Sequence, residues 1–353
     1  MMTLPMRASL KRQSGLSLLE LMIAITIGLF LLVGLVSVFS TSNQTYIDLS
    51  RASQQIENGR FAVQVLSDDI AHAGFYGRYS QTPTIPGVLP DPCVNNDMAA
   101  LRSAIAFPLQ GYDAPGASPI TACLPAVNHL AGTDILVVRR VDSTMSAGNA
   151  ATIPNAALTA NNIYMQANAD STATPVIAVA IGTQAGDEAA FPLKNKDATT
   201  FAPVRKYHLH IYFIAPCSVP AGGGTTCTGA NDDNGAPIPT LKRIELAANG
   251  TMNVIPLVEG IEDFQVDYGI DADHDGVPDT VYVTAPAAVP DWANVVSVRI
   301  NVLARNLEAS SGYIDTKTYD MGVAGAVTPG GAYKRHVYNA VIRIVNPASR
   351  RES

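Results

Sequence analysis

Charged residues and catalytic motifs are scarce in this chain of 353 residues. Only 15% of the residues are charged, and the formal net charge is −7. This acidic balance argues against a nucleic-acid surface and against electrostatic binding to anionic lipid. The serines, histidines and acids show no spacing typical of a nucleophile elbow, and no glycine-rich phosphate loop is present. The sequence therefore predicts a protein that is not an enzyme, with the polar composition of an exported chain.

Cysteine is also scarce, and no CxxC pair is present, which argues against a zinc site. The four cysteines are Cys93, Cys123, Cys217 and Cys227. An even number in an exported chain favours two disulfides, although four cysteines allow three pairings. Proximity along the chain favours Cys93–Cys123 and Cys217–Cys227. Each bond is expected to stabilise the fold by about 2–4 kcal/mol.

One charged residue, Glu20, interrupts the apolar run from Leu16 to Phe39. The run has about 24 residues, and a helix needs about 20 to span a bilayer. The preceding residues 1–15 carry three basic residues and no acid, so their removal takes the formal charge from −7 to −10. The basic flank predicts a cytoplasmic leader and an exported remainder.

A bare carboxylate in hydrocarbon costs several kcal/mol, so Glu20 requires a partner. Cleavage after Gly15 would expose the amine of Leu16. On one helix that amine and Glu20 are poorly placed to neutralise each other, whereas the amine of a neighbouring copy, shifted along the axis, can do so. The sequence therefore predicts an assembly device, and the alternative is an uncleaved signal anchor with an isolated glutamate.

The helical spacing of apolar residues continues beyond Phe39 as far as Ile70, and no proline interrupts Leu16 to Ala73. With Gly74 as the stop signal, the pattern predicts one helix of about 55 residues and about 80 Å. We expect a leader at 1–15, a transmembrane or filament-core half at 16–39, an amphipathic half at 40–74, and a periplasmic or extracellular β-rich head at 75–353. Gly28, Gly34 and Gly59 are interpreted as local soft points.

The head shows strand patterns separated by long loops. Strands are expected at Asp134–Arg140, Val176–Ile181, Tyr207–Ala215, Leu241–Leu246, Ile261–Ile270, Thr280–Thr284, Val295–Arg305 and Arg335–Val345. Clear alternation in several of them favours half-buried antiparallel sheets. Tyr76 to about Asn128 is interpreted as loops with short strands, and Asp142–Thr172 and Ala221–Pro237 as exposed loops.

An acidic stretch follows the strand that ends at Ile270. Its acids Asp271, Asp273, Asp275 and Asp279 occupy positions 1, 3, 5 and 9 of an EF-hand loop, with Gly276 at position 6 and the carbonyl of Val277 at position 7. Position 12 holds Tyr282 instead of the usual glutamate, and the flanks are strands. The stretch predicts a calcium-binding hairpin if Glu262, Asp267 or another carboxylate completes the shell. A solvated turn without an ion is the alternative.

Two histidines, His208 and His210, fall on one face of an expected strand. Alternation places Tyr207, Leu209, Ile211 and Phe213 on the opposite face. Two histidines without a third ligand favour an exposed or sheet-packed pair over a metal site.

The segment Gly15-Leu16-Ser17-Leu18-Leu19-Glu20-Leu21 resembles the class III signal of type IV pilins and type II secretion pseudopilins. In that superfamily a prepilin peptidase cuts after the glycine and N-methylates the new first residue. The resemblance implies cleavage after Gly15, methylation of Leu16 in place of the usual phenylalanine, and pairing of Glu20 with a neighbour's amine.

Features of the helix end and the last hundred residues resemble the PilW family of minor pilins, which is related to the J-type pseudopilins. They are Ala73-Gly74-Phe75-Tyr76-Gly77, the acidic hairpin after Ile270, the strand Val298–Arg305 and the strand Asn339–Asn346. Residues 76–240 show no such resemblance. The implied fold is α+β and type IV pilin-like, with a long N-terminal helix packed on an antiparallel β-sheet head.

The resemblance implies a minor pilin that starts in the inner membrane and then enters a type IV pilus. Its partners would be the prepilin peptidase, other minor pilins, the major pilin and a PilY-type tip adhesin. It would prime pilus assembly and lie at or near the tip. The alternatives are a J-type pseudopilin of a type II secretion system and a membrane-anchored, calcium-dependent adhesin that never assembles.

Overall fold

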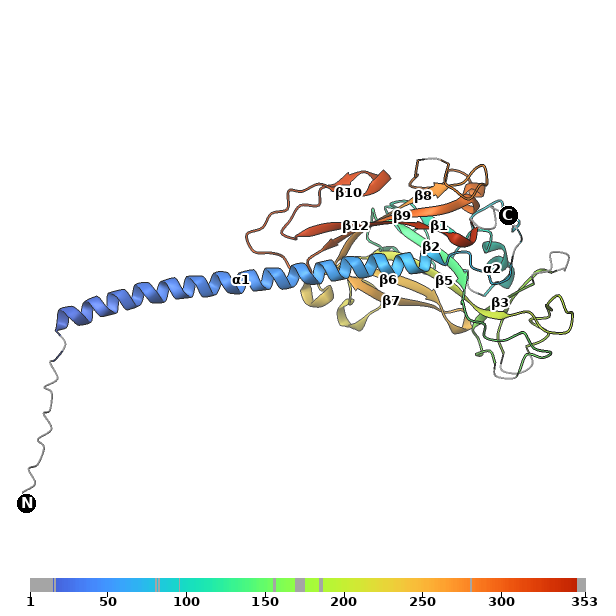
Figure 1. The fold of residues 1–353 in the computed structure, drawn as a ribbon, viewed down its shortest axis with the longest axis horizontal. Helices are drawn as coiled ribbons and strands as arrows, with labels where there is room; N and C mark the ends of the chain where they lie inside the picture. Colours follow the sequence, from blue (N-terminus) through green and yellow to red (C-terminus); the bar gives the residue numbers. More distant parts are fainter. Residues whose placement is uncertain are drawn as a thin grey trace, which may run out of the picture. The chain divides into compact units, whose positions relative to one another are not determined.

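The long N-terminal helix α1 runs from Leu18 to Ala71 in a computed structural model. The structure describes residues 15, 17–79, 81, 83–94, 96–154, 157–168, 175–183, 187–279 and 281–347. The chain forms two units, Met1–Arg51 and Ala52–Ser353, and the second contains the head with the last turns of α1. The helix and the β-rich head confirm the expected α+β, pilin-like fold (Figure 1).

The helix ends as the sequence predicts. The N–H groups of His72 and Ala73 donate to the carbonyls of Asp69 and Ile70, which tightens the last turn. Gly74 follows with φ +71°, the left-handed conformation in which glycine stops a helix without strain.

In the first unit, the apolar side chains of α1 are exposed on every side. Leu18, Phe30 and Phe39 are 78%, 81% and 69% exposed, and no described side chain before Gln55 is buried. By length and composition, α1 is able to cross a membrane. A helix that is apolar all round needs an apolar environment, which this chain does not supply among its described residues.

Three antiparallel sheets form the head. The seven-stranded sheet contains β1 Leu109–Tyr112, β2 Ile135–Val141, β3 Ile163–Ala167, β4 Ile177–Ile181, β5 Val204–Ala215, β6 Thr240–Leu246 and β7 Met252–Glu259. Its order is β1-β2-β5-β3-β4, and β6 extends from β5 and pairs with β7. The three-stranded sheet has the order β12-β9-β8, with β8 Ile261–Ile270, β9 Val295–Arg305 and β12 Arg335–Arg343. The third sheet pairs β10 Tyr319–Asp320 with β11 Ala326–Val327.

Short helices complete the head. They are α2 Met98–Ala104 and the 3₁₀ turns η1 Ala126–Asn128, η2 Ala221–Gly223, η3 Asp232–Gly235, η4 Ala248–Gly250, η5 Val289–Asn294 and η6 Gly322–Ala324. Asp97 caps α2 by accepting hydrogen bonds from the N–H groups of Ala99 and Ala100.

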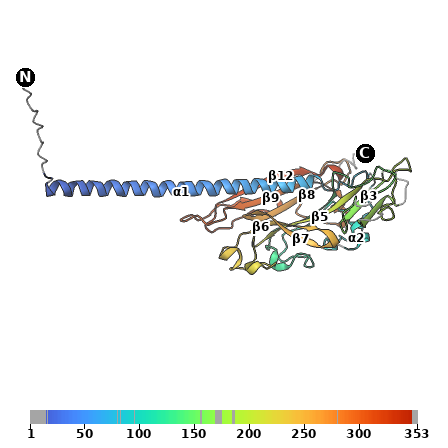
Figure 2. The ribbon, with the colours of Figure 1, turned by 90° about the horizontal axis from the view of Figure 1, so that it is seen from below.

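The last turns of α1 pack on both large sheets. Ala62, Leu66 and Ile70 are fully buried in a core that includes side chains of β2, β5, β8 and β9. In both views the same turns run alongside β9 and β12 (Figures 1 and 2). A second core lies on the opposite face of the seven-stranded sheet and contains Tyr207, Leu209, Ile211 and Phe213, the face that alternation predicts.

Several expected loops contain structure. The stretch 142–172 includes β3 and the buried Ile153 and Leu158, and the region after Tyr76 includes α2. The expected strand Thr280–Thr284 is wrong, because its described residues make only the isolated bridge between Val283 and Tyr268. The polar face of β8 and β9 is also covered, since Asp267 is fully buried.

Gly59 marks a close approach of α1 to β12 and not a soft point. A Cβ atom there would lie 2.2 Å from a ring carbon of Tyr338. Alanine favours a helix by about 1 kcal/mol over glycine. Forcing the ring away costs about 1–3 kcal/mol.

We predict that Gly59→Ala lowers the free energy of unfolding of the Ala52–Ser353 unit by about 1–2 kcal/mol, because the strain outweighs the helix propensity. Urea denaturation measures this change. Gly59→Ala combined with Tyr338→Ala should show a coupling that offsets part of the two single losses, since the second substitution removes the ring. Strict additivity would contradict the close contact.

Candidate functional site

The N-terminus of α1 is closed by a reciprocal pair of hydrogen bonds. The N–H of Ser17 donates to Oε2 of Glu20 at 3.0 Å, and the N–H of Glu20 donates to Oγ of Ser17 at 3.2 Å. This is a capping box, which satisfies two N–H groups that a helix end leaves free. The spacing Ser-x-x-Glu is the sequence signature of this cap, whereas the charge of Glu20 alone does not predict it.

Gly15 is described and exposed, whereas Leu16 and residues 1–14 lie outside the described residues. The cleavage site, the methylated amine and its pairing with Glu20 therefore stay predictions. The cap occupies Oε2 of Glu20, and a carboxylate has about four acceptor sites. Local capping and pairing with a second subunit are therefore compatible.

The junction between α1 and the head is a buried polar cluster around Asp69. Oδ1 of Asp69 accepts a hydrogen bond from Nε of Arg140 at 2.6 Å. Oδ2 accepts one from the Tyr212 hydroxyl at 2.8 Å and lies 2.7 Å from Nδ1 of His210. Asp69 is 6% exposed and His210 4% exposed, so both side chains have lost most of their hydration. Their contact with each other compensates for that loss.

Ionisation in this cluster follows from its contacts. Burial opposes the charge of Asp69, but hydrogen bonding and attraction to His210, with help from Arg140, lower the pKa of Asp69. Burial first, and then the charge of Asp69, raise the pKa of Tyr212. The contribution of Asp69 to stability is therefore present above its ordinary pKa of 3.8 and is lost as the pH falls through the lowered value.

The histidine pair lies on the helix-facing side of β5. Nε2 of His208 is 2.8 Å from Oδ1 of Asp142, and burial followed by repulsion from His210 lowers the pKa of His208 to about 4. Nε2 of His210 is 3.8 Å from Oε2 of Glu245. The pair is sheet-packed, and His210 joins the sheet to Asp69 of the helix. Asp69 and Arg140 complete the cluster, and no local sequence pattern predicts that these two residues meet.

We predict that Asp69→Asn lowers the free energy of unfolding of the Ala52–Ser353 unit by about 3–5 kcal/mol, because it removes one partner of a buried charge cluster. Asp68→Asn is the matched control, since Asp68 is the exposed neighbour on the same helix. Thermal and urea unfolding measure both variants. Equal stability of the two variants would contradict the role of Asp69.

The carboxylates of the acidic loop after β8 accept hydrogen bonds from the backbone N–H groups of the same loop. Asp271 is fully buried, and its carboxylate accepts hydrogen bonds from the N–H groups of His274 at 2.6 Å, Asp275 at 3.1 Å and Gly276 at 3.0 Å. His274 and Gly276 adopt positive φ, +69° and +86°. Oδ2 of Asp279 accepts from Ala272 and Asp273.

The structure brings three of the predicted metal ligands together. One carboxylate oxygen each of Asp271, Asp273 and Asp275 lies within 4.8 Å of the others. Asp279 is not in this group. Neither candidate for the missing carboxylate is available there, because Glu262 pairs with Arg335 and Asp267 pairs with Arg299 at 2.8 Å. The residues present therefore fit a cation through three carboxylates.

Both disulfides join the cysteines that proximity along the chain favours. Cys93 is bonded to Cys123 and Cys217 to Cys227. Asp232 lies near the second bond, and its carboxylate accepts from Ala221, Thr228 and Gly229. Because both sulfurs are in a disulfide, this cluster offers no thiolate to a metal.

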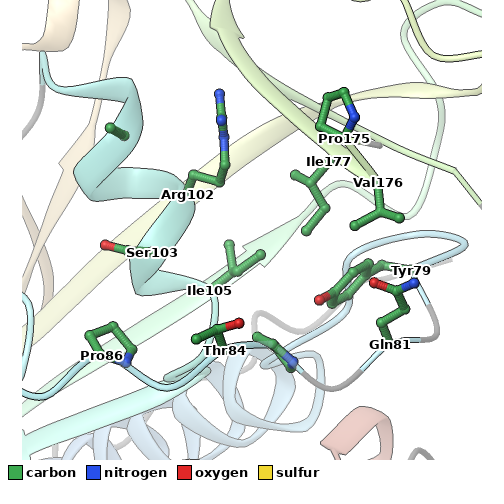
Figure 3. A pocket seen from close by; sticks show the side chains of 12 residues that line it. Tyr79, Gln81, Thr84, Pro86, Arg102, Ser103, Ile105, Pro175, Val176 and Ile177 are labelled. Atoms are coloured by element: carbon green, nitrogen blue, oxygen red, sulfur yellow. The ribbon is translucent and has the colours of Figure 1, made fainter. Parts of the chain in front are cut away.

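A pocket of about 680 Å³ opens between α2, the start of β4 and the segment around Tyr79 (Figure 3). Prolines, Ile105 and Ile177 make it mainly apolar, with Arg102 at one side. Its described lining residues include no histidine, cysteine or carboxylate side chain. The pocket therefore has the size of a ligand site.

An apolar N-terminal helix whose second half packs on an antiparallel head defines a pilin-like protein. Residues 10–36 match the prokaryotic N-terminal methylation motif. Residues 228–346 match the family model of type IV pilus-assembly protein W. The N-terminal segment therefore carries a prepilin methylation motif, and the C-terminal third of the chain has the sequence features of the type IV pilus-assembly protein W (PilW) family. The family consists of non-enzymatic structural proteins, which confirms that the chain is not an enzyme.

No curated protein and no solved structure gives a significant match to the chain. The two family matches leave residues 37–227 uncovered. The cluster around Asp69 lies largely in this uncovered part, so its role follows from geometry alone.

Proposed function

We propose that this pilus-assembly protein is a minor pilin that primes type IV pilus assembly and lies at or near the pilus tip. The observation that carries the proposal is the apolar half of α1, exposed on all sides from Leu18 to Phe39. Such a surface is stable in a bilayer or among the helices of other subunits. The inner membrane covers it before assembly, and the filament core covers it afterwards.

In this proposal the prepilin peptidase cuts after Gly15 and methylates Leu16. Glu20 caps its own helix and also accepts the charged amine of a neighbouring subunit, which lowers the cost of placing a carboxylate among apolar helices. The pairing sets the axial register between subunits. The partners are other minor pilins and the major pilin.

The size of the head supports a place in a tip complex. Two disulfide-bonded loops and helix α2, which packs against β4, add to the sheets of the head. Such a head suits specific contacts with a few partners, including a PilY-type adhesin, better than repetitive packing in a shaft. A chain that acts in type II secretion would instead leave twitching intact and impair secretion when it is deleted.

We predict that Glu20→Gln and Glu20→Ala both lower incorporation into pili at least tenfold, measured by immunoblotting of sheared fibres against the membrane pool. Glutamine keeps the capping box and removes the charge, whereas alanine removes both. Mass spectrometry of the incorporated wild-type protein should show a chain that starts at N-methylated Leu16.

Thr26→Ala is the control, because Thr26 bonds only to carbonyls of its own helix among the described residues. Normal incorporation of Glu20→Gln would mean that the cap alone matters, and it would refute the pairing between subunits. Retention of residues 1–15 in the fibre would refute the processing step.

We also propose that the acidic loop binds calcium through Asp271, Asp273 and Asp275, with the carbonyl of Val277 as a further ligand. Three converging carboxylates repel one another without a cation, and calcium prefers oxygen ligands. Three carboxylates and no bidentate glutamate favour the millimolar affinity of extracellular sites. The ion would hold the end of β8 next to β9.

We predict that calcium at ten times its Kd raises the Tm of the Ala52–Ser353 unit by about 2 °C, because binding to the native state stabilises it by about 1.4 kcal/mol. Asp273→Asn with Asp275→Asn should abolish the rise and leave Asp271 in place to support the loop. Asp113→Asn, an exposed acid outside the loop, should keep it. Differential scanning calorimetry that shows no rise for the wild type would discard the site.

A further inference from the structure

The pocket beside α2 is bounded by buried apolar side chains (Figure 3). Ile105 is the C-cap of α2, Ile177 is the first residue of β4, and Tyr79 lies in the segment after α1. All three are buried, and three prolines add further apolar surface to the lining. A volume of about 680 Å³ and a mainly apolar lining are typical of a site for a small molecule.

Arg102 gives this apolar pocket a single cation. Among the described residues of the lining it is the only one with a charge. It lies in the last turn of α2 and is exposed, and its side chain forms no hydrogen bond or ion pair within the described part of the chain. Arg299, by contrast, is already paired with the buried Asp267. The guanidinium of Arg102 is therefore available to an anion, and the charge of the pocket complements an anionic ligand.

The backbone around the pocket is unsuited to a peptide. Peptides that bind in an extended form take main-chain hydrogen bonds from a strand edge or a row of free N–H groups. Ile177 is the one described residue of the lining that lies in a strand. Pro83, Pro86 and Pro175 have no N–H group to donate. A peptide would therefore leave polar groups of its own backbone unpaired, whereas an aliphatic chain has none to satisfy.

We propose that this pocket binds a free fatty acid, with the aliphatic chain against the apolar walls and the carboxylate beside Arg102. The chain packs against Ile105, Ile177 and the ring of Tyr79, which removes apolar surface of both partners from water. The guanidinium forms charge-assisted hydrogen bonds with the carboxylate. The inference goes beyond the proposed function as a minor pilin and does not depend on it.

Photolabelling of the full chain in detergent tests the site. The probe is dodecanoate that carries a diazirine at the far end of its chain, and labelled peptides are identified by mass spectrometry. Labels should fall on residues that line the pocket. Unlabelled dodecanoate should reduce these labels at least fivefold more effectively than dodecanol, which has the same chain without the charge. Labels confined to the apolar half of α1, or equal competition by the two compounds, would overturn the proposal.

Arg102→Gln tests recognition of the carboxylate. Because Arg102 is exposed, the substitution should leave the Tm unchanged and lower labelling of the pocket at least fivefold. Arg60→Gln is the matched control, since Arg60 is an exposed helical arginine outside the lining. Labels on the apolar half of α1 should be equal in both variants and measure how much probe enters the detergent. Equal labelling of the pocket in the two variants would refute the role of Arg102.

Ala99→Trp tests the cavity itself. Ala99 is an exposed residue of α2 that lines the pocket, so a large ring there should occupy the space of the ligand without disturbing the core. Labelling of the pocket should fall at least tenfold relative to Ala99→Ser, which leaves the cavity open. Equal labelling of the two variants, with equal Tm values, would show that the probe binds elsewhere and would overturn the proposal. If Ala99→Trp unfolds, the competition between dodecanoate and dodecanol and the Arg102→Gln result decide.

Discussion

The carboxylate of Asp69 is the interaction on which the packing of α1 depends. Apolar contacts between Leu66, Ile70 and the sheets are strong but not directional. The bonds from Arg140 and Tyr212 and the close contact with His210 are directional, and they come from two adjacent strands. They define the rotation and axial position of the last turns of the helix, so that one half of α1 belongs to the head and the other half is left without cover.

Two acids on the same helix therefore have opposite surroundings. Asp69 is compensated inside the head, whereas Glu20 contacts only its own helix end among the described residues. Among the described residues, the apolar half of α1 and Glu20 stay exposed. These are the groups on which the proposed assembly of the subunit rests.

Local patterns account for the parts of the fold that the sequence predicted well. The helix, its glycine stop and strands β2, β4, β5, β6, β8, β9 and β12 follow from periodicity and turn residues. The sequence did not predict β3, which is short, or β7, which contains Pro256, because both have weak strand patterns. Pairing with β5 places β3, and pairing with β6 places β7. The strand expected at Thr280–Thr284 had an alternating pattern but no partner that extends a ladder.

By itself, the sequence determined the features that neighbouring residues control: the continuous helix, the acid in its apolar run, the disulfide candidates and the acidic loop. Only the tertiary structure decided which distant groups meet. Asp69 contacts His210, which lies 141 residues away along the chain. Glu262 and Asp267 form ion pairs with Arg335 and Arg299 and do not contribute to the acidic loop. The physical reason is the distance along the chain over which each effect acts. Periodicity and capping act within a few residues, whereas compensation of a buried charge depends on which strands the fold places beside it.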